Sequence, residues 1–244
     1  MKQVHFIQAA NRRLRVQQIG HIQANAPTLV FLHGGIDSIE MWRDFPEQVH
    51  QATGLCVIVY ERWGHGQSEP LTEFREYDTR AEEAGNVILV GHSYGGVISL
   101  VAASLHTEVV CAVVSIVPQM LIHDQCLAGA QEAKEAFENG DLRKKLFKFH
   151  GEGLDILFYD WINRVNSEAY QAEDCKQYLQ QISCPVLQIF GKEDGFGYLP
   201  NLDLSKKHIP SELSVKVVPD AGHYVHLDAK ETVVNEVKEF CLTL

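Results

Sequence analysis

The apolar residues of this chain gather in short runs separated by polar turns. Most of these runs are continuous, and they occupy residues 28–32, 55–60, 86–90, 111–117, 185–190 and 214–218. Strands buried on both faces of a parallel sheet have this pattern, because helices cover both faces. Helical patterns fall between them, at about 38–52, 96–106 and 229–241. Residues 2–9 and 12–19 instead resemble an antiparallel opening pair.

The regular alternation stops between Pro118 and Cys184. This stretch has no strand-like run and several helical ones. The second half of it carries apolar residues at the spacing of one helix face, namely Leu154, Leu157, Phe158, Trp161, Ile162 and Val165. A second helix of similar character is predicted after Gly140-Asp141. The pattern therefore predicts an α/β fold with a mostly parallel central sheet and a helical stretch near its middle.

Composition limits the classes of partner. A chain of 244 residues suffices for one large α/β domain, and its formal net charge is −11. Nucleic acids and anionic membrane surfaces do not attract an acidic protein, so we expect neither as a partner. No apolar run is long enough to span a membrane, and the first residues lack the apolar stretch of a signal peptide.

The six cysteines are widely scattered, and none has the spacing of a metal site. Cys56 and Cys111 lie inside apolar strand runs, where a buried thiol is the default. We therefore expect reduced thiols, a cytoplasmic location and no metal.

The strongest chemical signal is Gly91-His92-Ser93-Tyr94-Gly95, which lies between a strand run and a helical run. Strand, Gly-x-Ser-x-Gly and helix in this order are the context of a nucleophile elbow. The glycines are needed because so sharp a turn leaves no room for neighbouring side chains. The turn lifts the Ser93 hydroxyl clear of the sheet. The alternative is a tight turn with an idle serine, because the motif alone is weak evidence.

Further motifs follow other strand runs in a matching order. His33-Gly34-Gly35 follows residues 28–32 and presents an amide toward the same sheet edge. Asp194 follows the run that ends at 190, and His223 follows the run that ends at 218. With the order Ser…Asp…His, the chain resembles α/β-hydrolases of the small cap-bearing esterase and C–C hydrolase type. The resemblance covers nearly all of the chain.

This resemblance implies an α/β-hydrolase fold with a small helical cap inserted after the sixth strand, over the catalytic edge. The expected core is residues 1–117 and 185–244, and the expected cap is residues 118–184. Such a cap excludes water and shapes the substrate pocket. The alternative is plain packing of these helices against the sheet.

The resemblance also implies the roles of the catalytic residues. Ser93 is the expected nucleophile, which needs a base within hydrogen-bond reach. His223 is the expected base, because imidazole titrates near neutral pH, and His226 is a weaker rival. The backbone amides of Gly35 and Tyr94 are the expected oxyanion donors.

A carboxylate must hold the histidine in the correct tautomer. Asp194 is the expected acid. Glu193 is adjacent but points the other way if the loop is extended, and Asp220 is interpreted as a turn residue.

Residues 62–68 resemble the Asp-Arg-x-Gly-x-Gly-x-Ser loop of the family, but Glu61 replaces the usual aspartate. We interpret the loop as a structural turn braced by Arg62. Gly-x-Gly without a following helix is weak evidence for nucleotide binding, so no nicotinamide, flavin or other cofactor is expected.

These residues predict a serine hydrolase acting on a small ester-like substrate. The nearest alternative is hydrolysis of a C–C bond in a β-diketone-like substrate with the same triad. The alternative from another class is a non-catalytic ligand-binding or signalling protein on this fold, because fold alone does not settle function. Substrate identity cannot be derived from the sequence.

One departure from the family concerns residues 69–85, where relatives place a full amphipathic helix. This segment is highly charged and has few large apolar residues. It cannot offer the apolar stripe that normally shields the sheet, and open apolar surface is unfavourable. We expect a second subunit to cover that face, in a homodimer. The alternative is a compact rearrangement within a monomer.

Overall fold

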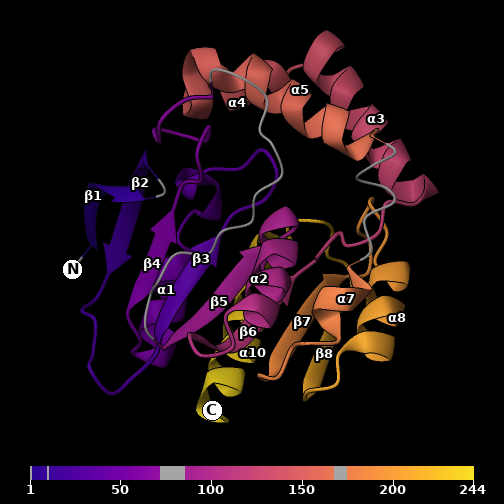
Figure 1. The fold of residues 1–244 in the computed structure, drawn as a ribbon. Helices are drawn as coiled ribbons and strands as arrows, with labels where there is room; N and C mark the ends of the chain where they lie inside the picture. The colour runs from indigo at the N-terminus through magenta and orange to yellow at the C-terminus, as the bar shows by residue number, and fades with distance from the viewer. Residues whose placement is uncertain (1, 10, 72–85, 168–174) are drawn as a thin grey trace.

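The apolar runs form the strands of one eight-stranded sheet, in the order β1-β2-β4-β3-β5-β6-β7-β8. The computed structural model describes residues 2–9, 11–71, 86–167 and 175–244 (Figure 1). The strands are β1 (Lys2–Ala9), β2 (Arg12–Ile19), β3 (Thr28–Leu32), β4 (Val57–Tyr60), β5 (Val87–His92), β6 (Val110–Ile116), β7 (Val186–Gly191) and β8 (Leu213–Val218). Each predicted strand is confirmed, with ends displaced by at most two residues.

The sheet is antiparallel at one edge and parallel elsewhere. β1 pairs with β2 and β2 with β4 in antiparallel register. All pairings from β4 through β3, β5, β6 and β7 to β8 are parallel. The carboxyl ends of these parallel strands therefore meet at one edge, where ligand sites of open α/β sheets form. The predicted α/β-hydrolase fold class is confirmed.

Helices cover both faces of the sheet. On one face α1 (Phe45–Thr53) and α10 (Lys230–Leu242) share an apolar cluster with β3, β4, β5 and β6. On the other face α2 (Tyr94–Leu105), α7 (Lys176–Leu179) and α8 (Leu199–His208) pack with alternate strand residues. The predicted helix over 38–52 divides into η1 (Ile39–Trp42) and α1, because Arg43 between them has φ +53°. The short α9 (Val225–Asp228) precedes α10.

Three further helices lie together across the carboxyl ends of the strands (Figure 1). They are α3 (Asp124–Asn139), α4 (Leu142–His150) and, after the turn η2 (Gly151–Gly153), α5 (Leu154–Val165). They share an apolar cluster separate from those of the sheet, in which Phe137 and Phe158 stack with ring centroids 3.7 Å apart. α7, by contrast, packs with the sheet although it lies inside residues 118–184. The division into core and cap stays a prediction.

Most of the segment 69–85 lies outside the described residues, which exclude 72–85. The predicted homodimer, which was argued from this segment, stays a prediction. Across the described ranges, no helix is long and apolar enough to cross a membrane.

Candidate functional site

Ser93 lies on a sharp turn between β5 and α2. Its backbone has φ +54° and ψ −119°, a conformation that non-glycine residues rarely adopt. The Ser93 amide donates to the Ile116 carbonyl at 2.8 Å, and the Ser93 carbonyl accepts from the amides of Gly96 and Val97. Hydrogen bonds on both sides thus hold the strained residue in place. The geometry is that of the predicted elbow.

The two outer glycines of the elbow motif permit close backbone approaches. A Cβ on Gly91 would collide with the carbonyl of Gly95, and a Cβ on Gly95 would collide with that of Leu32. These obstacles are backbone atoms, which cannot rotate away. The motif therefore requires glycine at both positions so that the elbow can lie against β3.

His223 and Asp194 extend from the loops after β8 and β7 and contact each other. The Nδ1 of His223 lies 3.1 Å from Oδ1 and 3.0 Å from Oδ2 of Asp194. The Asp194 side chain is fully buried, and its Oδ1 also accepts from the Phe196 amide at 2.9 Å. A buried carboxylate on Nδ1 leaves Nε2 of His223 for chemistry in the cavity, which both His223 and Ser93 line. Although both residues are described by the structure, His223 and Ser93 form no hydrogen bond with each other in it.

The rival residues lie in other environments. Glu193 and Asp220 are exposed, and Asp220 occupies a turn with φ +56°. His226 is buried against Trp42 and Phe45, with ring centroids 4.7 and 5.4 Å away. None of the three contacts His223 by a hydrogen bond within the described part of the chain. The geometry favours Asp194 and His223.

Gly35 and Tyr94, the expected oxyanion donors, line the same cavity as Ser93. The carbonyls of the loop that carries Gly35 are bound by side chains of other segments. The Gly34 carbonyl accepts from the Arg62 guanidinium, the Gly35 carbonyl lies 2.9 Å from Nε2 of His65, and the Ile36 carbonyl lies 3.0 Å from Nε2 of His150. Three consecutive carbonyls are therefore fixed by side chains from two other segments.

The contacts of His65 and His150 with this loop were not predicted from the sequence. His150 ends α4, and its Nδ1 also accepts the Gly66 amide at 3.0 Å. It thus joins α4 to the loop after β3 and to the loop after β4. No local pattern could have found it, because its partners lie more than 80 positions away.

Burial keeps several histidines of this region neutral. Desolvation lowers the pKa of His33 well below its ordinary value, and the charge of Arg62 lowers it further. Desolvation likewise lowers the pKa values of His150 and His226. For His150 the hydrogen bonds agree, since Nδ1 must be unprotonated to accept from Gly66.

We expect the free energy of unfolding to fall as pH drops below about 6.5, the ordinary pKa of histidine. Above that pH both the folded and the unfolded protein hold these histidines neutral. Below it the unfolded chain binds protons that the folded protein does not, so each buried histidine contributes up to about 1.4 kcal/mol of destabilisation per pH unit. Urea unfolding monitored by tryptophan fluorescence between pH 7.5 and 5.5 measures this slope.

The His150→Asn variant tests whether His150 is neutral in the folded protein. It should have a shallower pH slope than the parent protein, whereas His21→Asn, at an exposed position, should keep the parental slope. The difference in pH slope between the parent and His150→Asn isolates the contribution of His150, because other titrating groups such as Glu61 are the same in both proteins. Equal slopes in all three proteins would contradict the assignment.

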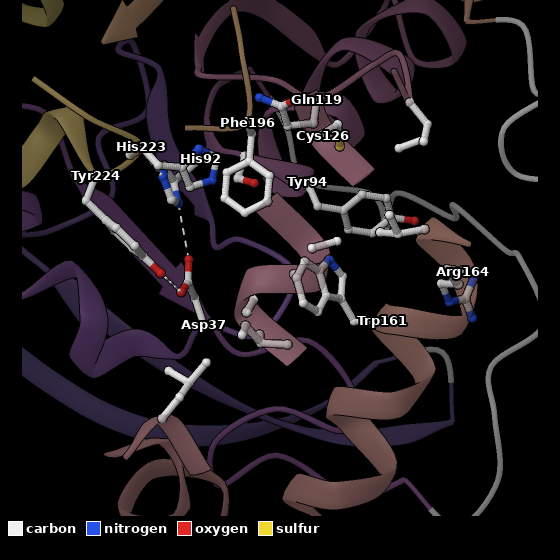
Figure 2. Close-up of a pocket in the computed structure, with 18 residues that line it drawn as sticks. Asp37, His92, Tyr94, Gln119, Cys126, Trp161, Arg164, Phe196, His223 and Tyr224 are labelled. Atoms are coloured by element: carbon white, nitrogen blue, oxygen red, sulfur yellow. Dashed lines mark hydrogen bonds and ion pairs between the residues drawn. The ribbon is translucent and has the colours of Figure 1, made fainter. Parts of the chain in front are cut away.

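A cavity of about 260 Å³ lies beside Ser93. Most of its wall is apolar, and Figure 2 shows the rings of Tyr94, Trp161 and Phe196 around it. The far wall comes from α3, α4 and α5 and includes Cys126, Ala130, Ala133, Leu142 and Val165. Its polar side chains include Gln119, which accepts from Asn201, and Arg164, which pairs with Asp160. The cavity suits a small, mainly apolar group.

Cys126 also lines this cavity. Burial, together with the charge of Asp194, raises the pKa of its thiol to about 11. A thiol in this state is protonated at neutral pH and is a poor nucleophile.

Glu61, the departure from the family motif, is fully buried at the start of its loop. Its carboxylate accepts from the Gln67 amide at 2.7 Å and from Arg15 at 3.1 Å. Gly66 lies so close that a Cβ there would collide with the Glu61 carboxylate. Glu61 therefore shapes the turn and takes no part in the cavity wall.

The sheet order, the strained serine elbow and the histidine–carboxylate contact at the carboxyl edge define the α/β-hydrolase class. A family model described as "Alpha/beta hydrolase family" matches residues 29–236. The chain belongs to this family and is an enzyme of the hydrolase type.

Similar proteins differ in what they act on. The sn-1-specific diacylglycerol lipase ABHD11 of Mus musculus is 23% identical over 258 residues, covering 89% of this chain and 81% of the relative. The 2-(acetamidomethylene)succinate hydrolase of Mesorhizobium japonicum is 25% identical over 274 residues, covering 97% and 95%. A crystal structure of a serine hydrolase involved in carbazole degradation superposes with a TM-score of 0.76 at 18% identity and covers 100% of both chains. That structure supports the fold alone.

Proposed function

We propose that this enzyme is a serine hydrolase that cleaves a small carboxylic-ester-like molecule through an acyl-enzyme on Ser93. The observation that carries the proposal is that Ser93 and the Asp194-bound His223 line one cavity. The cavity wall also includes Gly35 and Tyr94, whose amides are the proposed oxyanion donors. The mainly apolar lining favours a small acyl or alkyl group.

In the first half-reaction Ser93 Oγ attacks the ester carbonyl while His223 Nε2 takes the hydroxyl proton. The negative charge that develops on the carbonyl oxygen is stabilised by the amides of Gly35 and Tyr94. Asp194 holds the proton on Nδ1 and stabilises the imidazolium. The imidazolium then returns its proton to the departing alcohol, and the acyl group stays on Ser93.

In the second half-reaction a water molecule attacks the acyl carbon. His223 takes one proton of the water and returns it to Ser93 Oγ as the acid product leaves. The step requires Ser93 and His223 to come within hydrogen-bond distance. Catalytic hydrogen bonds are often long without substrate and tighten in the complex.

Substrate profiling of the purified enzyme tests this function. p-Nitrophenyl butyrate should be hydrolysed with a higher kcat/KM than p-nitrophenyl palmitate, because the cavity is small. A β-diketone should be cleaved far more slowly than the short ester. Preferential cleavage of the β-diketone would indicate the C–C hydrolase alternative instead. No turnover of either class, and no reaction with a fluorophosphonate probe, would support a non-catalytic protein.

A further inference from the structure

Asp37 is a buried carboxylate that takes no part in the proposed triad. Its Oδ2 accepts from the Gly34 amide at 3.0 Å and lies 3.1 Å from Nδ1 of His92. Its Oδ1 accepts from the Tyr224 hydroxyl at 2.9 Å. Figure 2 shows Asp37 between His92 and Tyr224, with dashed lines to both.

His92, the residue before Ser93, faces hydrogen-bond acceptors on both sides of its ring. Nδ1 faces the Asp37 carboxylate, and Nε2 lies 2.9 Å from the backbone carbonyl of His223. A carbonyl oxygen only accepts, so Nε2 must donate. With Asp37 ionised, both contacts are satisfied together only when each ring nitrogen of His92 carries a proton.

The ionisation of Asp37 agrees with that arrangement. Burial alone raises the pKa of Asp37, but the hydrogen bond and charge of His92 outweigh it, and the pKa falls well below its ordinary value. An ionised carboxylate accepts and does not donate.

The rings around His92 offer no other charge to compensate it. Tyr224, His223 and His226 lie with ring centroids 5.0, 5.1 and 4.6 Å from that of His92. Burial, followed by the charge of His92, lowers the pKa of His226, and burial raises the pKa of Tyr224, so both stay neutral. Removing one charge of this pair would leave the other buried without its partner.

Asp37 and His92 together connect three loops whose relative positions matter for catalysis. Asp37 binds the loop of Gly34 and Gly35, His92 belongs to the elbow of Ser93, and the His223 carbonyl belongs to the histidine loop. The Tyr224 hydroxyl gives Asp37 a second contact with the histidine loop.

We propose that Asp37 and a doubly protonated His92 form a buried ion pair that positions the loop of Gly34 and Gly35, and also His223, relative to Ser93. Both are positioning residues, since the acyl transfer itself runs through Ser93, His223 and Asp194. The inference rests on the proposed function for its kinetic consequence, but not for the protonation of His92.

Nuclear magnetic resonance of protein labelled with ¹⁵N-histidine tests the protonation without any substrate. His92 should have a proton on both ring nitrogens at pH 7.5, with both signals assigned by their loss in His92→Gln. Asp37→Asn should reduce this to one ring proton, because the neutral amide no longer compensates an imidazolium. A single ring proton on His92 in the parent enzyme would overturn the proposal whatever the activity of the enzyme.

Kinetics test the positioning role, with kcat expressed per active site titrated by a fluorophosphonate. Asp37→Asn keeps the shape of the side chain, so KM should stay within about threefold while kcat falls about 10²-fold, the effect of a small misplacement of reacting groups. Tyr224→Phe, which removes one hydrogen bond and keeps the ion pair, should lose only about threefold to tenfold in kcat.

Asp220→Asn is the matched control, because it makes the same change at an exposed position on the histidine loop. It should keep the parental kcat. An Asp37→Asn enzyme with a kcat within threefold of the parent would overturn the positioning role. If the parent enzyme itself shows neither turnover nor labelling, the proposed function fails, whereas the resonance measurement still decides the state of His92.

Discussion

The Ser93→Ala enzyme is expected to hydrolyse p-nitrophenyl butyrate about 10⁶-fold more slowly than the parent, the loss that follows removal of a triad nucleophile. Alanine has no oxygen that can carry the acyl group. The residual rate comes from substrate binding and oxyanion stabilisation, which do not need the hydroxyl. Initial rates at saturating substrate, corrected for the uncatalysed reaction, measure the effect. Intact-protein mass after fluorophosphonate treatment should show one adduct on the parent and none on the variant.

Ser104→Ala is the matched control for this loss. Ser104 lies on α2, the helix that begins at the elbow, and its hydroxyl donates to the Val101 carbonyl at 2.7 Å. This variant should retain labelling and turnover. A covalent adduct that persists in the Ser93→Ala protein would mean that another residue is the nucleophile.

Asp194→Asn is expected to lower kcat by about 10⁴-fold while leaving the fold intact. The Asp194 carboxylate is fully buried and accepts a hydrogen bond from Nδ1 of His223. An asparagine amide can turn its NH₂ group toward Nδ1, which favours the tautomer with the proton on Nε2. That tautomer cannot accept the proton of Ser93, so the base is lost. Steady-state kinetics, with thermal unfolding as the check on folding, measure the effect.

The rival carboxylates serve as controls for Asp194. Glu193→Gln and Asp220→Asn change exposed side chains on the same two loops, and both should keep kcat within about threefold of the parent. The assignment of Asp194 is wrong if its asparagine variant turns over normally while one of these two is inactive.

The strands and the elbow could be predicted from the sequence because their physical causes are local. Runs such as Thr28–Leu32 are continuous because they are buried on both faces of the sheet. The motif around Ser93 can be recognised because the sharp turn requires glycine at positions 91 and 95, where neighbouring backbone atoms leave no room for a Cβ. The pairing of His223 with Asp194 was implied by the resemblance to α/β-hydrolases, and the two residues meet because parallel strands bring their carboxyl ends together.

Other parts of the site depend on contacts between distant segments, which no local pattern encodes. Asp37 lies 55 positions from His92 and 187 from Tyr224, so the sequence alone suggests only a polar loop residue. The helix α8 was not predicted because two of its four buried positions, Asn201 and Ser205, are polar. Asn201 is buried because its side chain binds the amides of Met120 and Leu121.

The contacts of α4 and α5 with the loop that carries Gly35 and Ile36 limit how this enzyme can diversify. His150 binds the Ile36 carbonyl and the Gly66 amide, and Trp161 lies so near Gly35 that a Cβ there would be 2.8 Å from the indole. A transplanted α4 without a counterpart of His150 would leave those two backbone groups unpaired, at a cost of about 1–3 kcal/mol each. α3 contributes apolar wall residues such as Ala130 and Ala133 and has no such bond to the loop in the described residues. New substrate preferences are therefore most accessible through exchanges along α3, where the pocket can be reshaped while the loop that carries Gly35, the proposed oxyanion donor, stays as it is.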